Sequence, residues 1–228
     1  MKIIDITVDL ETCALPPTAA VMTLAAVVWQ RNGVDSPFYS EEIKAEDILD
    51  KNPACFFNHI DIRSMFLDGF TFDQQTAAWW ASQDEAAKES LLGYDETPLL
   101  RIDVVVRNFF SWISGIKEDN GADTVYLWSQ GSDFDIAILR NICYKYGIEI
   151  PIGYHNFRDH RTFFMEGARL ICEAGGTEFN QDQAYKLVDD YSEIEPGVKH
   201  DPVYDCKRSI YSTWQMMKHL RSLIGIKI

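Results

Sequence analysis

Acidic side chains, in one case with a histidine, stand beside apolar segments at three places in this 228-residue chain. They are Asp9 and Glu11, then Asp133 and Asp135, and finally His200 and Asp205. Carboxylates are the ligands that hard divalent cations prefer, and an imidazole with a pKa near ~6.5 exchanges protons at neutral pH. Such a set could bind metal ions and activate a water. Each pair alone means little, because a chain this acidic contains about one D-x-E pair by chance.

Asp9 and Glu11 close the segment Ile3 to Leu10, which is rich in β-branched residues and alternates strictly. The alternation predicts a strand, so both carboxylates point to one side at its carboxyl end, where open α/β sheets place their sites. The two acids repel each other unless a cation lies between them. The alternative interpretation is a solvated strand end.

Asp133 and Asp135 follow the apolar segment Val125 to Ser129, a predicted strand. A helical apolar pattern begins directly after it, and Ser132 or Asp133 could cap that helix by accepting bonds from its free N–H groups. Asp135 is less easily explained as a cap. We therefore predict that Asp135 faces the site, with Asp133 as the alternative.

His200 and Asp205 flank the predicted start of the last helix. Pro202 suits the first helical position and Asp201 the N-cap. This arrangement places His200 just outside the helix, where it is mobile, and Asp205 in the second turn, where it is held. The alternative for His200 is an ordinary polar surface residue.

The composition limits the classes of function. The 21 basic and 35 acidic side chains give a net charge of −14, so a nucleic-acid partner needs a local basic patch or metal ions. The hydrophobic content of 46% excludes disorder, and the apolar runs are too short to span a bilayer. Five separated cysteines fit neither a disulfide framework nor a zinc site. We expect an untargeted cytoplasmic protein that does not bind membranes.

The remaining pattern predicts a single α/β domain over residues 1–228, since no linker or repeat divides the chain. Strands at 3–10, 21–30 and around 38–43 form an antiparallel N-terminal meander. Further strands are expected at 125–129 and around 156–161, and helices within 76–92 and at 98–116, 134–146, 162–174, 184–191 and 202–223. The prediction is a mixed sheet with flanking helices.

In this order along the chain the segments resemble a known family. Asp9-Leu10-Glu11-Thr12, Phe134-Asp135 with Leu139, and His200 with Asp205 resemble the three exonuclease motifs of the DEDD superfamily, histidine subgroup, which is DnaQ-like. Thr76 to Gln83 with the following EAAKESLL, and Arg158 to Thr162, are similar to segments of the branch containing phage exonuclease A and mycobacterial 3′-to-5′ exoribonuclease. The resemblance implies a ribonuclease-H-like fold and 3′-to-5′ hydrolysis of DNA or RNA to nucleoside 5′-monophosphates.

The resemblance also implies a cofactor and a role for each residue. The ligands of two divalent cations, Mg²⁺ or Mn²⁺, would be Asp9, Glu11, Asp135 and Asp205. Asp9 would bridge both ions, Glu11 and Asp205 would complete the ion on the nucleophile side, and Asp135 would hold the ion at the leaving group. His200 would be the general base, and Thr12 would lie beside the 3′-terminal nucleotide.

Two positions depart from the common family pattern. Gly131 stands where many members have Asn, four residues before the second-motif Asp, and Pro202 stands where many have a small residue such as Ala. Pro202 is easily accommodated at a helix start. Gly131 keeps Asp133 open as the alternative ligand to Asp135.

The expected partner is the 3′ end of a nucleic acid, single-stranded or an overhang, and a homodimer is left open. The basic residues nearest to the motifs in sequence are Arg140, Lys145, Arg158 and Arg161. An ion pair with Asp159 is an equally good interpretation of Arg161. Trp79 or Trp80 could stack on a base, but adjacent helical residues face different directions, so at least one of them belongs to the core or an interface.

Two rival functions fit the same residues. One is a metal-dependent hydrolase of mononucleotides or small phosphate esters, and the other is a non-catalytic acidic interaction module on the same fold. Every family position has the required chemistry here, which disfavours the non-catalytic module. DNA and RNA are not distinguished, because a 2′-OH is sensed by geometry that no local motif records.

Overall fold

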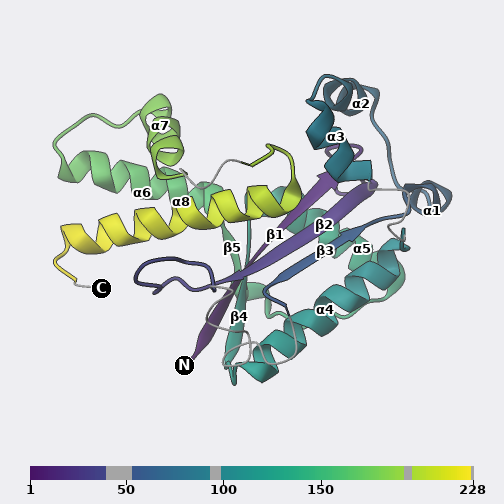
Figure 1. Ribbon diagram of the computed structural model, residues 1–228, viewed down its shortest axis with the longest axis horizontal. Helices are drawn as coiled ribbons and strands as arrows, with labels where there is room; N and C mark the ends of the chain where they lie inside the picture. Colours follow the sequence, from purple (N-terminus) through teal and green to yellow (C-terminus); the bar gives the residue numbers. More distant parts are fainter. Residues whose placement is uncertain (40–52, 93–98, 193–196, 227–228) are drawn as a thin grey trace.

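The computed structural model describes residues 1–39, 53–92, 99–192 and 197–226, and a five-stranded sheet lies at its centre (Figure 1). The strands are β1 (Ile3–Thr12), β2 (Val21–Trp29), β3 (Cys55–His59), β4 (Thr124–Ser129) and β5 (Phe157–Asp159). Their order is β3-β2-β1-β4-β5. The β1–β2 and β2–β3 pairs are antiparallel, whereas β1–β4 and β4–β5 are parallel. The predicted α/β class with a mixed sheet is confirmed.

The helices cover both faces of this sheet. They are α1 (Ile62–Leu67), α2 (Gln74–Ala81), α3 (Glu85–Leu92), α4 (Ile102–Asp119), α5 (Ala137–Tyr146), α6 (His160–Ala174), α7 (Gln181–Tyr191) and α8 (Pro202–Leu223). Helices α4 and α5 lie on one side, and α8 with α6 and α7 lies on the other, while α2 and α3 stand near the carboxyl end of β1 (Figure 1). Within the described segments, no helix combines the length and apolarity that crossing a membrane requires.

Strand β1 separates an apolar face from a polar one. Its apolar residues, which join the main core with α4 and α5, are Ile4, Ile6, Val8 and Leu10. The residues between them face α6 and α8 because side chains alternate along a strand. These are Asp5, Thr7, Asp9 and Glu11. The alternation seen in the sequence therefore sets these four polar side chains on the α8 face.

The third strand of the meander differs from the prediction around 38–43. Phe38 forms only an isolated antiparallel bridge with Trp29, and residues 40–43 lie outside the described residues. On the side of β2 away from β1, the strand that pairs with it is β3. The five residues of β3 are too few to show a clear alternation.

Several helix boundaries also differ. The helix predicted at 98–116 begins at Ile102, because Leu100 is held extended beside the end of β3 by an isolated bridge with Ile60. Helix α6 begins at His160, so the strand predicted around 156–161 ends at Asp159, whose carboxylate caps the helix by accepting from Thr162 N. The short helix α1 was not predicted. The last helix has the predicted bounds.

Candidate active site

The carboxyl end of β1 extends beyond its neighbour β4. The parallel pairing runs from Ile3 to Thr7 of β1, so the later residues of β1 have no partner in β4. A π-helical turn, η2 (Ser132–Ile136), follows β4 at this point. Asp135 Oδ1 accepts a hydrogen bond from Leu10 N at 3.2 Å, in the place of a strand partner, and Asp135 is only 3% exposed. Asp135 therefore lies against the acidic end of β1, as predicted.

The start of η2 is stabilised in a different way from the one predicted. Neither Ser132 nor Asp133 caps this described turn, and Asp133 is exposed. Instead, Asp159 Oδ2 accepts from Ser132 N at 2.5 Å. Gly131 has a φ of +125°, which L side chains rarely adopt, so glycine fits the backbone at this departure from the family pattern.

His200 and Asp205 are linked through the backbone at the start of α8. Asp201 caps the helix by accepting from Tyr204 N at 2.8 Å, and Pro202 is its first residue, as predicted. His200 has a φ of 67° and is the one non-glycine residue with positive φ among those described. Such a conformation costs about 1–3 kcal/mol and is common at functional sites. Asp205 Oδ2 accepts from His200 N at 3.2 Å and stabilises this conformation.

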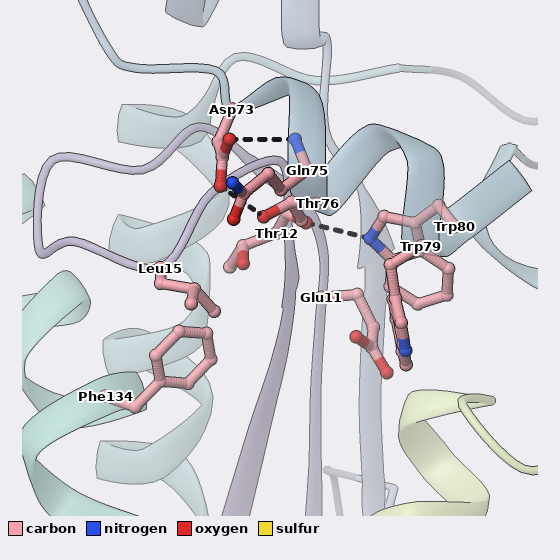
Figure 2. Close-up of a pocket in the computed structure, with 9 residues that line it drawn as sticks. All are labelled: Glu11, Thr12, Leu15, Asp73, Gln75, Thr76, Trp79, Trp80 and Phe134. Atoms are coloured by element: carbon pink, nitrogen blue, oxygen red, sulfur yellow. Dashed lines mark hydrogen bonds between the residues drawn. The ribbon is translucent and has the colours of Figure 1, made fainter.

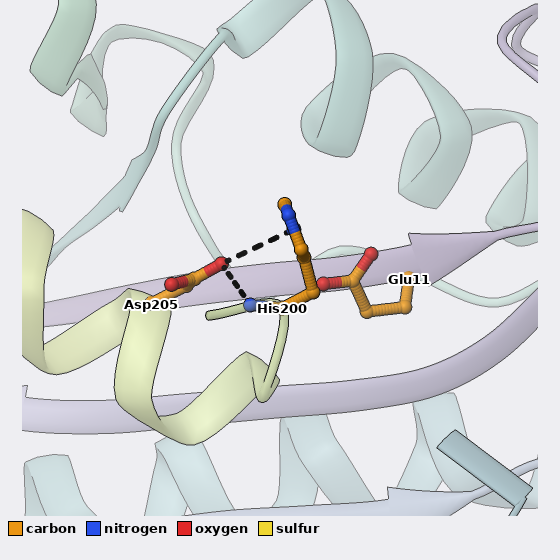
Figure 3. A group of neighbouring side chains, drawn as sticks. All are labelled: Glu11, His200 and Asp205. Carbon is orange, nitrogen blue, oxygen red and sulfur yellow. Dashed lines mark hydrogen bonds and ion pairs between the residues drawn. The ribbon is translucent and has the colours of Figure 1, made fainter. Parts of the chain in front are cut away.

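Glu11, His200 and Asp205 converge across the gap between β1 and α8 (Figure 3). Each offers a ligand atom, and these atoms lie within 4.8 Å of one another. His200 Nδ1 is 3.9 Å from Asp205 Oδ2. Residues from the first and third motifs, nearly the length of the chain apart, thus form a single cluster that could hold a metal ion.

Asp9 and Asp135 are not part of this three-residue group, but the charges of Asp9, Asp135, Glu11 and Asp205 act on one another, and we call these four residues the acidic cluster. The electrostatics of the acidic cluster favour a bound cation. Burial, followed by the charges of Glu11 and Asp135, raises the pKa of Asp9 well above its usual range. Burial and the charge of Asp205 raise the pKa of Glu11 to about 9, and burial raises that of Asp135 to about 7. Burial also raises the pKa of Asp205. Carboxylates that are buried and repel one another are stabilised by a cation, and an oxygen-rich donor set suits Mg²⁺ or Mn²⁺, so the residues fit a divalent metal site.

A pocket of about 410 Å³ adjoins the cluster (Figure 2). Its lining residues are Glu11, Thr12, Leu15, Asp73, Gln75, Thr76, Trp79, Trp80 and Phe134. Trp80 is 9% exposed, and its Nε1 donates to the backbone oxygen of Thr12 at 3.0 Å, whereas Trp79 is 45% exposed. The two tryptophans therefore face different directions, as predicted. The volume lies in the range of small-molecule sites.

A family model described as the 3′-5′ exoribonuclease Rv2179c-like domain matches residues 4–214. The chain belongs to this family. Membership confirms the predicted 3′-to-5′ exonuclease activity and makes nucleic acid the substrate of the exoribonuclease domain. A comparison with curated proteins found no significant match.

Solved structures resemble the exoribonuclease domain in fold. Cell-death related nuclease 4 (CRN-4) has a TM-score of 0.58 at 14% identity, with 95% of this chain and 64% of that chain covered. The nuclease domain of 3′hExo, a DEDDh family member bound to rAMP, has a TM-score of 0.56 at 12% identity, with 95% of this chain and 92% of that chain covered. A full-length 3′-exonuclease has a TM-score of 0.53 at 11% identity, with 95% of this chain and 81% of that chain covered. The predicted ribonuclease-H-like fold is confirmed.

The pocket of the exoribonuclease domain contains residues that the sequence did not single out, namely Leu15, Asp73 and Gln75. Leu15 follows β1, whereas Asp73 and Gln75 lie at the start of α2, so they meet only in the folded chain. Asp73 gave one signal, since it precedes the helical TAAWWASQ and caps α2 by accepting from Gln75 N at 2.9 Å. A capping pattern predicts the helix start but not the pocket beside it.

Proposed function

We propose that this chain removes nucleotides one at a time from the 3′ end of RNA, uses two divalent cations, Mg²⁺ or Mn²⁺, and releases nucleoside 5′-monophosphates. The observation that carries the proposal is the position of Glu11, which belongs both to the acidic cluster and to the wall of the nucleoside-sized pocket. A phosphodiester attached to a nucleoside in this pocket therefore meets the carboxylates. The choice of RNA is supported by the description of the family as exoribonucleases.

The proposed cation ligands are Asp9, Glu11, Asp135 and Asp205. When bound, two such ions neutralise the phosphate and lower the pKa of an attacking water. The imidazole of His200 takes the proton from this water. Asp205 holds the backbone of His200 through the bond from its N–H, and the rings of Trp79 and Trp80 contact the imidazole from the pocket side. These contacts orient the general base.

The pocket suits the 3′-terminal nucleoside. Leu15, Trp79 and Phe134 offer apolar surface for the base, while Thr12 and Gln75 offer polar groups for the sugar or the base edge. The Thr12 hydroxyl donates to the backbone oxygen of Ala14 at 2.7 Å, so its own oxygen can still accept a bond from the substrate. Residues of α2 form one wall of the pocket. A wall on that side favours the end of a nucleic-acid chain over an internal nucleotide as the substrate.

Digestion of 5′-labelled RNA and DNA oligonucleotides tests the proposal. With Mg²⁺ or Mn²⁺, we expect stepwise shortening from the 3′ end, faster on RNA, and no reaction with EDTA. The Asp9→Asn variant is the matched control, and a 3′-phosphate on the RNA should block the reaction. Internal fragments formed before mononucleotides, or equal cleavage in EDTA, would contradict the proposal. Hydrolysis of mononucleotides alone would favour the small phosphate-ester hydrolase.

A homodimer stays a prediction. Analytical ultracentrifugation, which measures the oligomeric state, tests it.

A further inference from the structure

Arg161 follows the edge strand β5, which β4 separates from β1 in the sheet. It is the second residue of α6, directly after the edge strand β5, whereas most of the pocket residues come from the end of β1 and from α2. In the sheet order β3-β2-β1-β4-β5, the acids at the ends of β1 and β4 lie between the two. With the terminal nucleoside in the pocket and its phosphate at the acids, the rest of the strand can continue toward β5, and Arg161 stands on that side.

The guanidinium of Arg161 is fixed against the loop that carries Asp135. Nη1 and Nη2 are each 3.6 Å from the point where a Cβ on Gly131 would lie, and Nη2 donates to the backbone oxygen of Gln130 at 3.1 Å. Gln130 Oε1 in turn accepts from Ser209 of α8 at 2.5 Å. The positive charge of Arg161 partly opposes the rise in the pKa of Asp135 that burial causes. Arg161 is therefore a positioned cation beside the second motif.

Arg161 and Asp159 do not form the ion pair that the sequence suggested, although they are close enough for the charge of Arg161 to act on the carboxyl. The carboxylate oxygens of Asp159 accept from Ser132 N and Thr162 N instead. Arg161 is exposed, and its bond to the backbone oxygen of Gln130 uses one of the five N–H donors of its guanidinium. Most of its donors are thus available to a ligand.

The other basic residues that the sequence suggested are engaged in packing. Arg158 lies 3.9 Å from the centroid of the Tyr126 ring and donates to two backbone oxygens. Arg140 lies 4.6 Å from the Phe157 ring centroid, and Lys145 Nζ lies 5.2 Å from that of Phe70. Of these four, Arg161 is the one that lies against the loop carrying Asp135 while forming neither an ion pair nor a cation–π contact in the described part of the chain.

We propose that Arg161 binds the first phosphate of the departing strand, one nucleotide on the 5′ side of the scissile phosphate. The inference rests on the proposed function, because it needs the terminal nucleoside in the pocket. A guanidinium presents paired N–H donors that match phosphate oxygens, which makes it suited to a phosphodiester anion. A chain with a net charge of −14 repels a polyanion at long range, so a local cation on the exit path makes extended strands bind better than a single nucleotide.

Two substrates distinguish binding of this second phosphate from action at the scissile phosphate or support of the loop. One is a short oligoribonucleotide, and the other is a p-nitrophenyl ester of a nucleoside 5′-monophosphate, which has a scissile phosphodiester but no second phosphate. For Arg161→Gln we expect the KM of the oligonucleotide to rise about tenfold, as for a lost charged hydrogen bond, with kcat little changed. Ester hydrolysis should stay within about twofold of wild type, and the salt dependence of oligonucleotide binding should weaken by about one phosphate contact.

Arg169→Gln is the matched control, because Arg169 is an exposed arginine further along the same helix α6. It should leave both substrates unaffected. Arg161→Lys keeps the charge without the paired donors, so it should recover part of the loss. An equal loss on both substrates would overturn the proposal, since Arg161 would then act at the scissile group or support the loop. An unchanged KM for the oligonucleotide would overturn it as well.

Binding without turnover tests the role of Arg161 separately from catalysis. If the wild-type protein hydrolyses neither substrate, the proposed function fails. The affinity of a fluorescent oligoribonucleotide, measured by anisotropy in Ca²⁺ without turnover, still compares wild type with Arg161→Gln. Equal affinities there would overturn the assignment of Arg161 independently of catalysis.

Discussion

The indole of Trp79 meets the imidazole of His200 edge to face, with the ring centroids 4.9 Å apart and the planes at 78°. Trp79 belongs to α2, whereas His200 precedes α8 at the other end of the chain. Because Trp79 also lines the pocket, the contact joins the wall of the proposed nucleoside site to the proposed general base. An edge-to-face aromatic contact is worth about 0.5–1.5 kcal/mol beyond the area it buries.

Removing this ring should lower turnover. We expect Trp79→Ala to reduce kcat about tenfold, because ~1.4 kcal/mol of orientation at the base corresponds to one decade in rate. Trp79→Phe keeps an aromatic edge and should stay within about threefold of wild type. Tyr144→Ala, on the exposed face of α5, is the control and should have no effect. Steady-state kinetics on an oligoribonucleotide give the comparison, and equal kcat values for all variants would refute the positioning role.

The two acids of the second motif should differ sharply in activity. Asp135 is buried and bonded to Leu10 N, while Asp133 is exposed. Asp135→Asn keeps the shape and an acceptor for Leu10 N but removes the charge that attracts a cation, so we expect at least a ~100-fold loss of kcat in a folded protein. Asp133→Asn should retain near-normal turnover. Kinetics together with thermal melts decide between them, and the reverse ranking would assign the second-motif ligand to Asp133.

Divalent cations should stabilise the fold. A cation at about 100 times its Kd contributes ~2.7 kcal/mol if it binds only the folded state, which for a chain of this size raises Tm by about 5–10 °C. We expect this shift with Mg²⁺ or Mn²⁺ and its reversal by EDTA in differential scanning fluorimetry. Asp9→Asn should abolish most of the shift while raising the metal-free Tm, because it relieves repulsion among the buried carboxylates. A full shift in Asp9→Asn would remove Asp9 from the ligand set.

The parts of the site that local patterns encode could be predicted from the sequence. Strict alternation in β1 set Asp9 and Glu11 on one face, and the Asp201-Pro202 pair located the start of α8 and hence Asp205. The choice of Asp135 over Asp133 was harder, because it depends on β4 ending before β1 and leaving Leu10 N free for a carboxylate. That relationship belongs to the pairing of two strands and leaves no mark in either segment.

Contacts between distant segments account for what the sequence could not predict. Arg161 and Asp159 looked like an ion pair because they are neighbours in sequence, but Asp159 is committed to two backbone N–H groups. The short strand β3 carries little alternation, so its pairing with β2 identifies it where its composition does not. Burial of a histidine is a third such property, and His160 shows it.

His160 is fully buried between β1 and α8. Its Nε2 lies 3.0 Å from Thr7 Oγ1 and its Nδ1 lies 2.6 Å from Thr213 Oγ1. The ring stacks on Trp128 with centroids 4.9 Å apart. A neutral imidazole has one donor and one acceptor, which two hydroxyl groups can satisfy, whereas the charged ring would lie in an apolar layer. Burial accordingly lowers the pKa of His160 to about 3.

Protonation of His160 should make the fold sensitive to acid. Because the folded pKa lies below the unfolded value of ~6.5, the unfolded state binds the proton first, and stability falls as the pH drops below that value. The loss should reach about 2 kcal/mol near pH ~5 and level off close to the folded pKa. The acidic cluster contributes a slope of the opposite sign to the free energy of unfolding against pH, because its pKa values are raised. Urea unfolding of His160→Gln must therefore be compared with wild type across this range.

His160→Gln should lower stability at neutral pH yet remove this acid-dependent loss, whereas His155→Gln, at an exposed site, should follow the wild-type curve. Parallel curves for wild type and His160→Gln would show that His160 is not the acid-sensitive group.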